Sequence, residues 1–206
     1  MTASPGNRRA DRRGVLAALA AVCVLPPASA FAQTAPPSVP EIAARRRAAD
    51  LDARFLDLAG AATQADADAI VAAIWQLWLV SGDAAIDALT ERGVANMQIG
   101  NLPSALAIFD EVVARMPDYA EGWNKRATVL YLMDEYDRSL ADCADVLARE
   151  PRHFGALSGI GLIALARGDE RAALQALRRA LAVNPFLRER HDLIPELERR
   201  VGEKKL

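Results

Sequence analysis

The sequence has few aromatic residues, few histidines and few cysteines. Of its 206 residues only 5% are Phe, Trp or Tyr, two are His and two are Cys. Aromatic and β-branched residues favour pleated strands, whereas the abundant Ala, Leu, Arg and Glu favour helices, so this composition argues against a β-sandwich or a barrel. Two cysteines cannot form the disulfide framework of a small secreted scaffold. The length suits one helical domain with its own core.

Sequence motifs for catalysis and metal binding are also missing. The chain has no glycine-rich phosphate loop, H-E-x-x-H helix, C-x-x-C pair or G-x-S-x-G elbow. Its 25 Lys and Arg against 27 Asp and Glu give a net formal charge of −2, so no basic field is available to attract nucleic acid. We therefore expect a protein that is not an enzyme, holds no cofactor or metal, and does not bind nucleic acid.

Residues 1–32 have the pattern of a cleavable signal peptide. Four arginines precede an uncharged run over residues 14–25, and small residues up to Ala32 supply a cleavage site. That run is shorter than the roughly 20 residues that span a bilayer. We expect cleavage near Ala30 or Ala32, a periplasmic location and no stable membrane anchor afterwards. The segment RRGVL at residues 12–16 resembles a twin-arginine export signal; the alternative is an ordinary arginine-rich Sec leader.

The mature chain differs from the precursor in charge and in cysteine content. Removing residues 1–32 takes away four arginines and one aspartate, so the net formal charge falls from −2 to −5, and Cys143 becomes the lone thiol. Residues 33–40 contain three prolines and read as a flexible or polyproline-like linker. Folding is expected to begin near Glu41.

From residue 86 onwards the sequence repeats with a period of 34 residues. Pro117, Pro151 and Pro185 follow one another at this interval. Other columns keep the same spacing: large Leu89, Trp123 and Leu157, then small Gly93, Ala127 and Gly161, then small Ala105, Ser139 and Ala173. A 34-residue unit with small residues at fixed places and a terminal proline resembles the tetratricopeptide repeat (TPR). The resemblance implies an all-α fold, a right-handed α-solenoid of helix-turn-helix repeats.

The period sets the expected domain boundaries. Three repeats cover residues 86–119, 120–153 and 154–187. Residues 41–82 read as an N-terminal helical hairpin, either a degenerate repeat or a cap, and residues 188–206 as a C-terminal capping helix and tail, kinked or restarted at Pro195.

The resemblance also implies a binding surface. In TPR proteins the first helices of successive repeats line a concave groove that commonly binds a peptide or protein segment. By repeat column, the candidate groove residues are Thr90, Val94, Met97, Glu121, Asn124, Thr128, Tyr131, Ser158, Leu162 and Leu165. Family members that grip a chaperone's C-terminal carboxylate use several Lys, Arg and Asn side chains there. Only Asn124, with Lys125 beside it, remains in this chain, so we expect no such clamp.

The predicted function is that of a non-catalytic periplasmic module that binds a peptide or protein of unknown identity in this groove, as a scaffold or adaptor. Alternatives are a self-associating structural protein or an accessory subunit of an envelope enzyme. The groove could instead be filled by residues 41–58 of the same chain. The oligomeric state stays open.

Four other features have a structural interpretation beside a functional one. His153 lies in a packing column between repeats, and Cys143 lies in a core column, with a disulfide to a partner as its alternative. Trp75 and Trp78 share one helix face and are read as core residues, or else as an exposed partner anchor. The basic run at residues 45–47 is read as a solvated face, with attraction to anionic lipid as the second interpretation.

Overall fold

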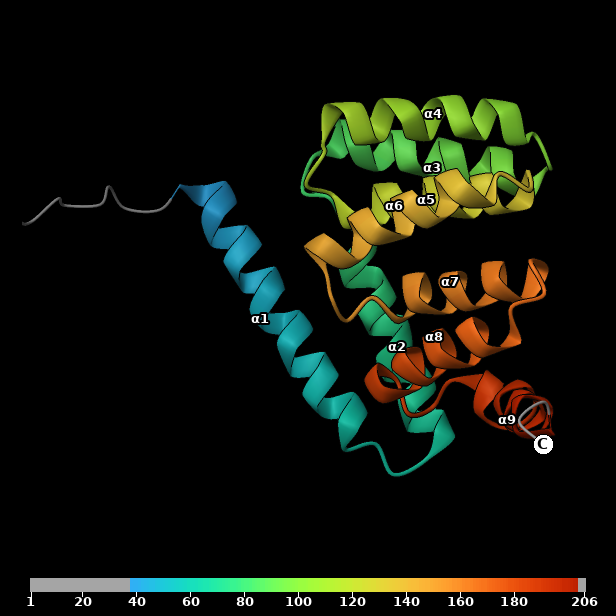
Figure 1. The fold of residues 1–206 in the computed structure, drawn as a ribbon. Coiled ribbons are helices and arrows are strands. Elements are labelled where there is room, and N and C mark those ends of the chain that lie inside the picture. The colour runs from blue at the N-terminus through green and yellow to red at the C-terminus, as the bar shows by residue number, and fades with distance from the viewer. Residues whose placement is uncertain (1–37, 204–206) are drawn as a thin grey trace, which may run out of the picture. The chain divides into compact units, whose positions relative to one another are not determined.

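The computed structural model describes residues 38–203, which lie within one compact unit (Figure 1). The expected signal peptide and most of the expected linker lie outside the described residues. The described elements are α1 (Val39–Ala59), α2 (Gln64–Leu79), α3 (Ala84–Gln98), α4 (Leu102–Arg115), α5 (Ala120–Leu132), α6 (Tyr136–Arg149), α7 (Phe154–Ala166), α8 (Glu170–Val183), η1 (Arg188–Arg190) and α9 (Leu193–Glu203). Over this part of the chain the secondary structure is helical throughout, so the all-α prediction is confirmed.

Three helical hairpins form the solenoid. Helices α3 and α4, α5 and α6, and α7 and α8 pack against each other, and successive hairpins stack through α4 on α5 and α6 on α7. The three first helices begin at Ala84, Ala120 and Phe154, beside the starts that the 34-residue period predicts. In the part of the chain that is described, no single helix is long and apolar enough to cross a bilayer. Taken together, α2 and α3 have sufficient length and apolar composition, but they are bent by 119° relative to each other.

Each hairpin reverses through a residue with left-handed backbone. Gly100, Asp134 and Gly168 have φ angles of 75°, 59° and 76°, which only glycine adopts without steric cost. Asp134 is therefore the one non-glycine residue at this turn column. The hairpins then close tightly: a Cβ at Gly93 would lie 2.5 Å from the Phe109 ring. The small columns of the repeat are thus required by the close approach of paired helices.

The C-terminal segment, expected to be a capping helix kinked or restarted at Pro195, consists of two short helical pieces. A short 3-10 turn, η1, precedes α9, and α9 begins at Leu193. Pro195 lies in the first turn of α9, where backbone N–H groups make no intrahelical hydrogen bond, so its missing N–H costs the helix nothing. Ile194 and Leu197 are buried and pack against the core residues of α8. The segment therefore covers the apolar face of the third repeat, as a solenoid cap must.

The N-terminal hairpin begins slightly earlier than predicted. The side chain of Ser38 accepts a hydrogen bond from the backbone N–H of Glu41, whose carboxylate accepts one from the N–H of Ser38, so a capping box starts α1 at Val39. Helix α1 packs on α2 through Leu51, Phe55 and Leu58. The remaining surface of α1 is largely exposed.

Arg47 corrects the interpretation of the basic run as a solvated face. Its guanidinium donates to the carbonyl oxygens of Val80 and Ser81 at 2.8 and 3.2 Å, so it ties α1 to the turn between α2 and α3. Arg45 and Arg46 are exposed.

Candidate functional site

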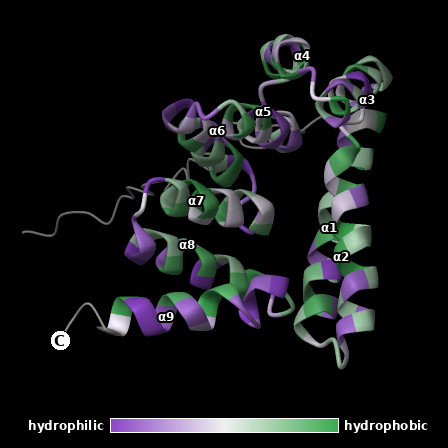
Figure 2. Ribbon diagram, turned by 90° about the vertical axis from the view of Figure 1, so that its right-hand side faces the viewer, coloured by the Kyte–Doolittle hydropathy of each residue, from purple (hydrophilic) through white to green (hydrophobic). Residues whose placement is uncertain are grey.

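Helix α2 lies across the beginnings of the solenoid's first helices. Figure 2 shows the α1–α2 hairpin running steeply across the direction of α7, α8 and α9. The indole of Trp78 stacks on the His153 ring with centroids 4.1 Å apart, and Trp75 meets Phe154 edge-on at 5.5 Å. The hydroxyl of Tyr119 donates to the backbone carbonyl of Leu79 at 2.8 Å. These contacts join the hairpin to the starts of α5 and α7.

A buried carboxylate lies beneath this contact. Glu121 exposes 1% of its surface and accepts hydrogen bonds from His153 Nε2 at 3.0 Å and from Asn124 Nδ2 at 3.1 Å, while Lys125 Nζ lies 2.8 Å away. Burial raises the pKa of Glu121, but the hydrogen bond from His153 and the charge of Lys125 outweigh it and hold the pKa below its usual value. The carboxylate is thus ionised and fully partnered.

His153 has a defined structural role. Its Nδ1 accepts the backbone N–H of Ala156 at 3.1 Å and so caps α7. Since Nδ1 accepts, the ring hydrogen sits on Nε2 and points to Glu121. The histidine therefore links the cap of α7 to the carboxylate of α5 and supports the Trp78 indole on its face.

The structure divides the candidate groove residues into two sets. Thr90, Glu121 and Asn124 are buried at the α2 end of the groove, with 4%, 1% and 8% exposure. Ser158 lies at the boundary. The others lie towards the far ends of α3, α5 and α7: Val94, Met97, Thr128, Tyr131, Leu162 and Leu165. Of these, Val94, Met97 and Leu165 are half-buried against core residues. We call the remaining three, Thr128, Tyr131 and Leu162, the open half of the groove.

The open half contains a small cavity. Its volume is about 150 Å³, and its lining includes Thr128, Tyr131 and Leu162 together with the small residues Ser158 and Gly159. Leu162 is 37% exposed, and Thr128 is exposed as well. The arrangement offers an apolar floor with hydroxyl groups beside it, which suits a partly apolar partner segment.

The segment that covers one end of the groove is α2, whereas the sequence suggested residues 41–58 as an occupant. Residues 41–58 belong to α1, which contacts α2, whereas α2 itself supplies Trp75, Trp78 and Leu79 to the groove. Trp75 and Trp78 thus pack between the hairpin and the third repeat. One signal pointed there: Gly155 stands in the column of Asp87 and Glu121, and a Cβ on it would lie 2.7 Å from Trp75 Cη2.

The remaining candidate sites are structural. Cys143 is free and 3% exposed, and burial raises the pKa of its thiol to about 12, so it is a core residue at the base of the small cavity and a poor candidate for a disulfide to a partner. Trp78, at 7% exposure, is equally inaccessible as an anchor. Across residues 38–203, His, Cys, Asp and Glu side chains form no group of three that could hold a metal ion.

Comparison with known proteins supports the repeat assignment. No family model matches the chain. A TPR repeat-containing protein of Rhizobium etli is 42% identical over 108 residues, or 52% of this chain and 53% of that protein, so the chain spans about half the length of this curated relative.

Solved structures show the same fold. The first TPR of Spaghetti (RPAP3) bound to an HSP90 peptide has a TM-score of 0.54 at 17% identity, covering 57% of this chain and 93% of that one. The Sgt2 TPR domain from Aspergillus fumigatus gives 0.55 at 17% identity over 60% and 83% of the two chains. The TPR2B domain of yeast Sti1 in complex with an Hsp70 peptide has a TM-score of 0.53 at 18% identity, covering 59% of this chain and 99% of that one. Residues 84–203 of this chain therefore form a helical solenoid of the tetratricopeptide-repeat type.

Proposed function

We propose that this protein is a non-catalytic interaction module and that the open half of its groove binds a peptide or protein segment. The observation that carries the proposal is the exposed apolar floor at Leu162 and Tyr131, beside a cavity of about 150 Å³ on the concave side. Two of the similar solved structures hold peptides, which supports a binding role for the same fold.

The binding mode differs from a carboxylate clamp. The Asn124 amide is hydrogen-bonded to Glu121, and Lys125 is paired with the same carboxylate. Neither group is free to receive a partner's carboxylate. Recognition therefore rests on shape and apolar burial over Tyr131 and Leu162. The Thr128 hydroxyl, which donates to the backbone carbonyl of Asn124 at 2.9 Å, is available as a hydrogen-bond acceptor.

The proposed place of action is the periplasm. The leader pattern of residues 1–32 supports export, and Cys143, the lone cysteine of the mature chain, is buried, which is compatible with an oxidising compartment. A scaffold or adaptor of the envelope is the role we assign.

A site-specific photo-crosslinker tests the proposal. It is placed at position 162 in the open half and, as a matched control, at the exposed position 175 on α8, the second helix of the same repeat. We expect a discrete crosslinked partner from position 162 in envelope extracts, lost when Tyr131→Ala is added, and none from position 175. Equal crosslinking from both positions, or a product insensitive to Tyr131→Ala, would contradict the groove assignment.

A further inference from the structure

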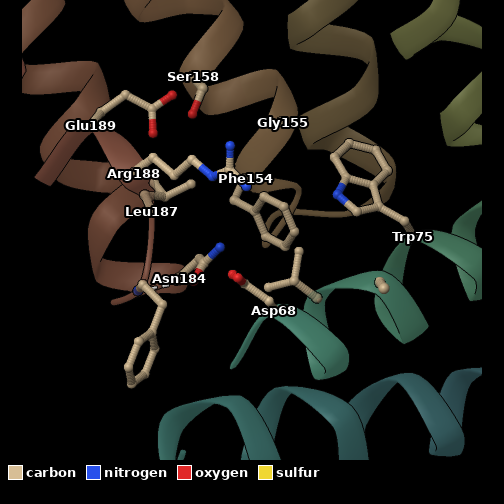
Figure 3. A pocket seen from close by; sticks show the side chains of 12 residues that line it. Asp68, Trp75, Phe154, Gly155, Ser158, Asn184, Leu187, Arg188 and Glu189 are labelled. Atoms are coloured by element: carbon tan, nitrogen blue, oxygen red, sulfur yellow. Dashed lines mark hydrogen bonds between the residues drawn. The ribbon is translucent and has the colours of Figure 1, made fainter. Parts of the chain in front are cut away.

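A second and larger cavity lies where α2 meets the third repeat (Figure 3). Its volume is about 500 Å³, and it is bounded by one face of α2, the start of α7 and the turn at residues 184–189. Gly155 and Ser158 line both this cavity and the open half of the groove, so the two spaces adjoin. We call this space the α2 cavity.

The walls of the α2 cavity are apolar, and polar groups converge on it. Trp75, Phe154 and Leu187 supply large apolar side chains. Figure 3 shows five polar side chains directed into the space, from three separate segments of the chain: Asp68, Ser158, Asn184, Arg188 and Glu189. Such a mixture is typical of a ligand site, in which the apolar walls bind and a few polar groups select.

Two of these polar groups have unused hydrogen-bonding capacity. Asn184 is only 3% exposed; its Oδ1 accepts the backbone N–H of Phe186 at 3.0 Å, but within residues 38–203 its Nδ2 donates to no acceptor. The Ser158 hydroxyl oxygen is buried and likewise has no partner in the described chain. Buried polar groups are nearly always paired, so the Ser158 hydroxyl calls for a partner from outside the described chain, while the Asn184 amide N–H groups remain free to donate to one.

The charges in the cavity are also uncompensated. The Asp68 carboxylate accepts only from the Gln64 amide, at 2.9 Å, and within the described residues neither Glu189 nor Arg188 forms an ion pair. Among the lining residues, two carboxylates against one guanidinium leave one net negative charge. Asp68 and Arg188 are exposed, and Arg190, outside the lining, donates to the Gln64 side chain beside Asp68. One added cation satisfies the balance of the lining residues. The Trp75 ring already has a cation beside it, since Lys125 Nζ lies 5.7 Å from its centroid.

We propose that the α2 cavity binds a lysine or arginine side chain carried on an extended segment of a partner protein, whose apolar residues continue past Gly155 into the open half of the groove. An extended segment presents alternating N–H and C=O groups. The carbonyl groups match the Asn184 amide and the Ser158 hydroxyl, while the cation matches Asp68 and Glu189. This inference rests on the proposed function and adds the chemical class of the partner.

Three blocked peptides of the form acetyl-Leu-Phe-X-Phe-Leu-amide, with X as Lys, Gln or Glu, test the charge preference. The indole N–H signal of Trp75, assigned with Trp75→Phe, reports on the cavity during NMR titration, and Trp123 serves as an internal control. We expect the Lys peptide to bind about three- to tenfold more tightly than the Gln peptide, and the Glu peptide most weakly. The preference should shrink at about 0.5 M NaCl because exposed charges are screened.

Variants assign the preference to named groups. Asp68→Asn with Glu189→Gln should remove the difference between the Lys and Gln peptides, whereas Arg188→Gln should increase it. Glu91→Gln, an exposed acid on α3, is the matched control and should change nothing. The urea midpoint of each variant verifies folding, and Glu189→Gln alone replaces the pair should the double variant unfold.

Other results overturn the proposal. These are equal affinities for the three peptides, a Lys preference that survives Asp68→Asn with Glu189→Gln, or a Trp75 shift produced equally by lysine amide, which would indicate a small-amine site. A Trp75 signal that moves with protein concentration alone would indicate a second copy as the occupant. A failure of the proposed groove function alone gives a different result. The Lys peptide would then bind the double variant Tyr131→Ala, Leu162→Ala as tightly as it binds the unaltered protein.

Discussion

Gly155→Ala tests whether α2 is held against α7. The added Cβ would lie 2.7 Å from Trp75 Cη2 and 3.2 Å from the His153 ring, so one of these must move. Movement of the Trp75 ring would disturb its packing, since it meets Trp78, His153 and Phe154 with centroids 5.1, 5.5 and 5.5 Å away. Overpacking of this kind costs about 1–3 kcal/mol. The gain in helix propensity from Gly to Ala, up to about 1 kcal/mol, is reduced in the first turn of a helix.

Gly159→Ala is the matched control, one turn further along α7. A Cβ there would lie 3.6 Å from Cys143 Sγ, an ordinary contact. We expect Gly159→Ala to stabilise the protein by about 0.5–1 kcal/mol and Gly155→Ala to destabilise it by about 1–2 kcal/mol. In urea, with an m-value of about 2 kcal/mol/M, the midpoint would rise by about 0.3–0.5 M in the first and fall by about 0.5–1 M in the second.

A double-mutant cycle assigns the cost to Trp75. Trp75→Leu removes the atom that clashes, so Gly155→Ala should cost at least about 1 kcal/mol less in that background. The reasoning is refuted if Gly155→Ala stabilises the protein as much as Gly159→Ala does, or if its cost is unchanged by Trp75→Leu. Either result would mean that α2 does not lie on α7 as described.

Three further predictions concern stability and reactivity. Asp134→Gly should stabilise the second hairpin by about 0.5–1 kcal/mol in urea, because the φ angle of 59° is unfavourable for any residue but glycine. The gain should be larger in a Tyr136→Phe background, which already lacks the hydrogen bond from Tyr136 to Asp134. A loss of stability in that background would contradict the strain argument. Glu121→Gln should cost about 3 kcal/mol by leaving Lys125 without its anion and His153 Nε2 without its carboxylate acceptor. Because the pKa of Glu121 is lowered below 4.5, its stabilising contribution is complete above about pH 4.5 and is lost as pH falls through the lowered pKa; urea midpoints from pH 3 to 7 should therefore flatten in Glu121→Gln, and an unchanged profile would contradict the network. Cys143, with a thiol pKa of about 12, should react with a thiol reagent only on unfolding, and rapid labelling in native buffer would disprove its burial.

The repeats could be predicted from the sequence because each depends on local chemistry. Tight reversals at Gly100 and Gly168, and small residues where helices cross, recur every 34 residues, so one unit explains the next. The start of α1 was also within reach: Ser38 followed by Glu41 is a capping-box signature. The neighbouring prolines, however, favour a linker over the same residues.

The position of α2 could not be predicted in the same way. It depends on contacts between residues 75 or more positions apart, such as Trp78 with His153 and Trp75 with Phe154, and it does not follow the 34-residue period. The sequence therefore placed Thr90, Glu121 and Asn124 in an accessible groove, where the structure buries them. Two residues gave an indirect signal, the glycine at position 155 and the acid at position 121. Their roles become clear only from their distant partners, Trp75 for Gly155 and His153 for Glu121.

The division of the concave surface into a covered half and an open half is tested most directly by chemical-shift mapping with a partner segment captured at position 162. The account predicts shifts at Thr128, Tyr131 and Leu162, with the Trp78 indole and the Glu121 network unchanged. Shifts at Trp78 and Glu121, together with release of α2 from α7, would contradict it, because the partner would then occupy the half that this chain covers with its own helix.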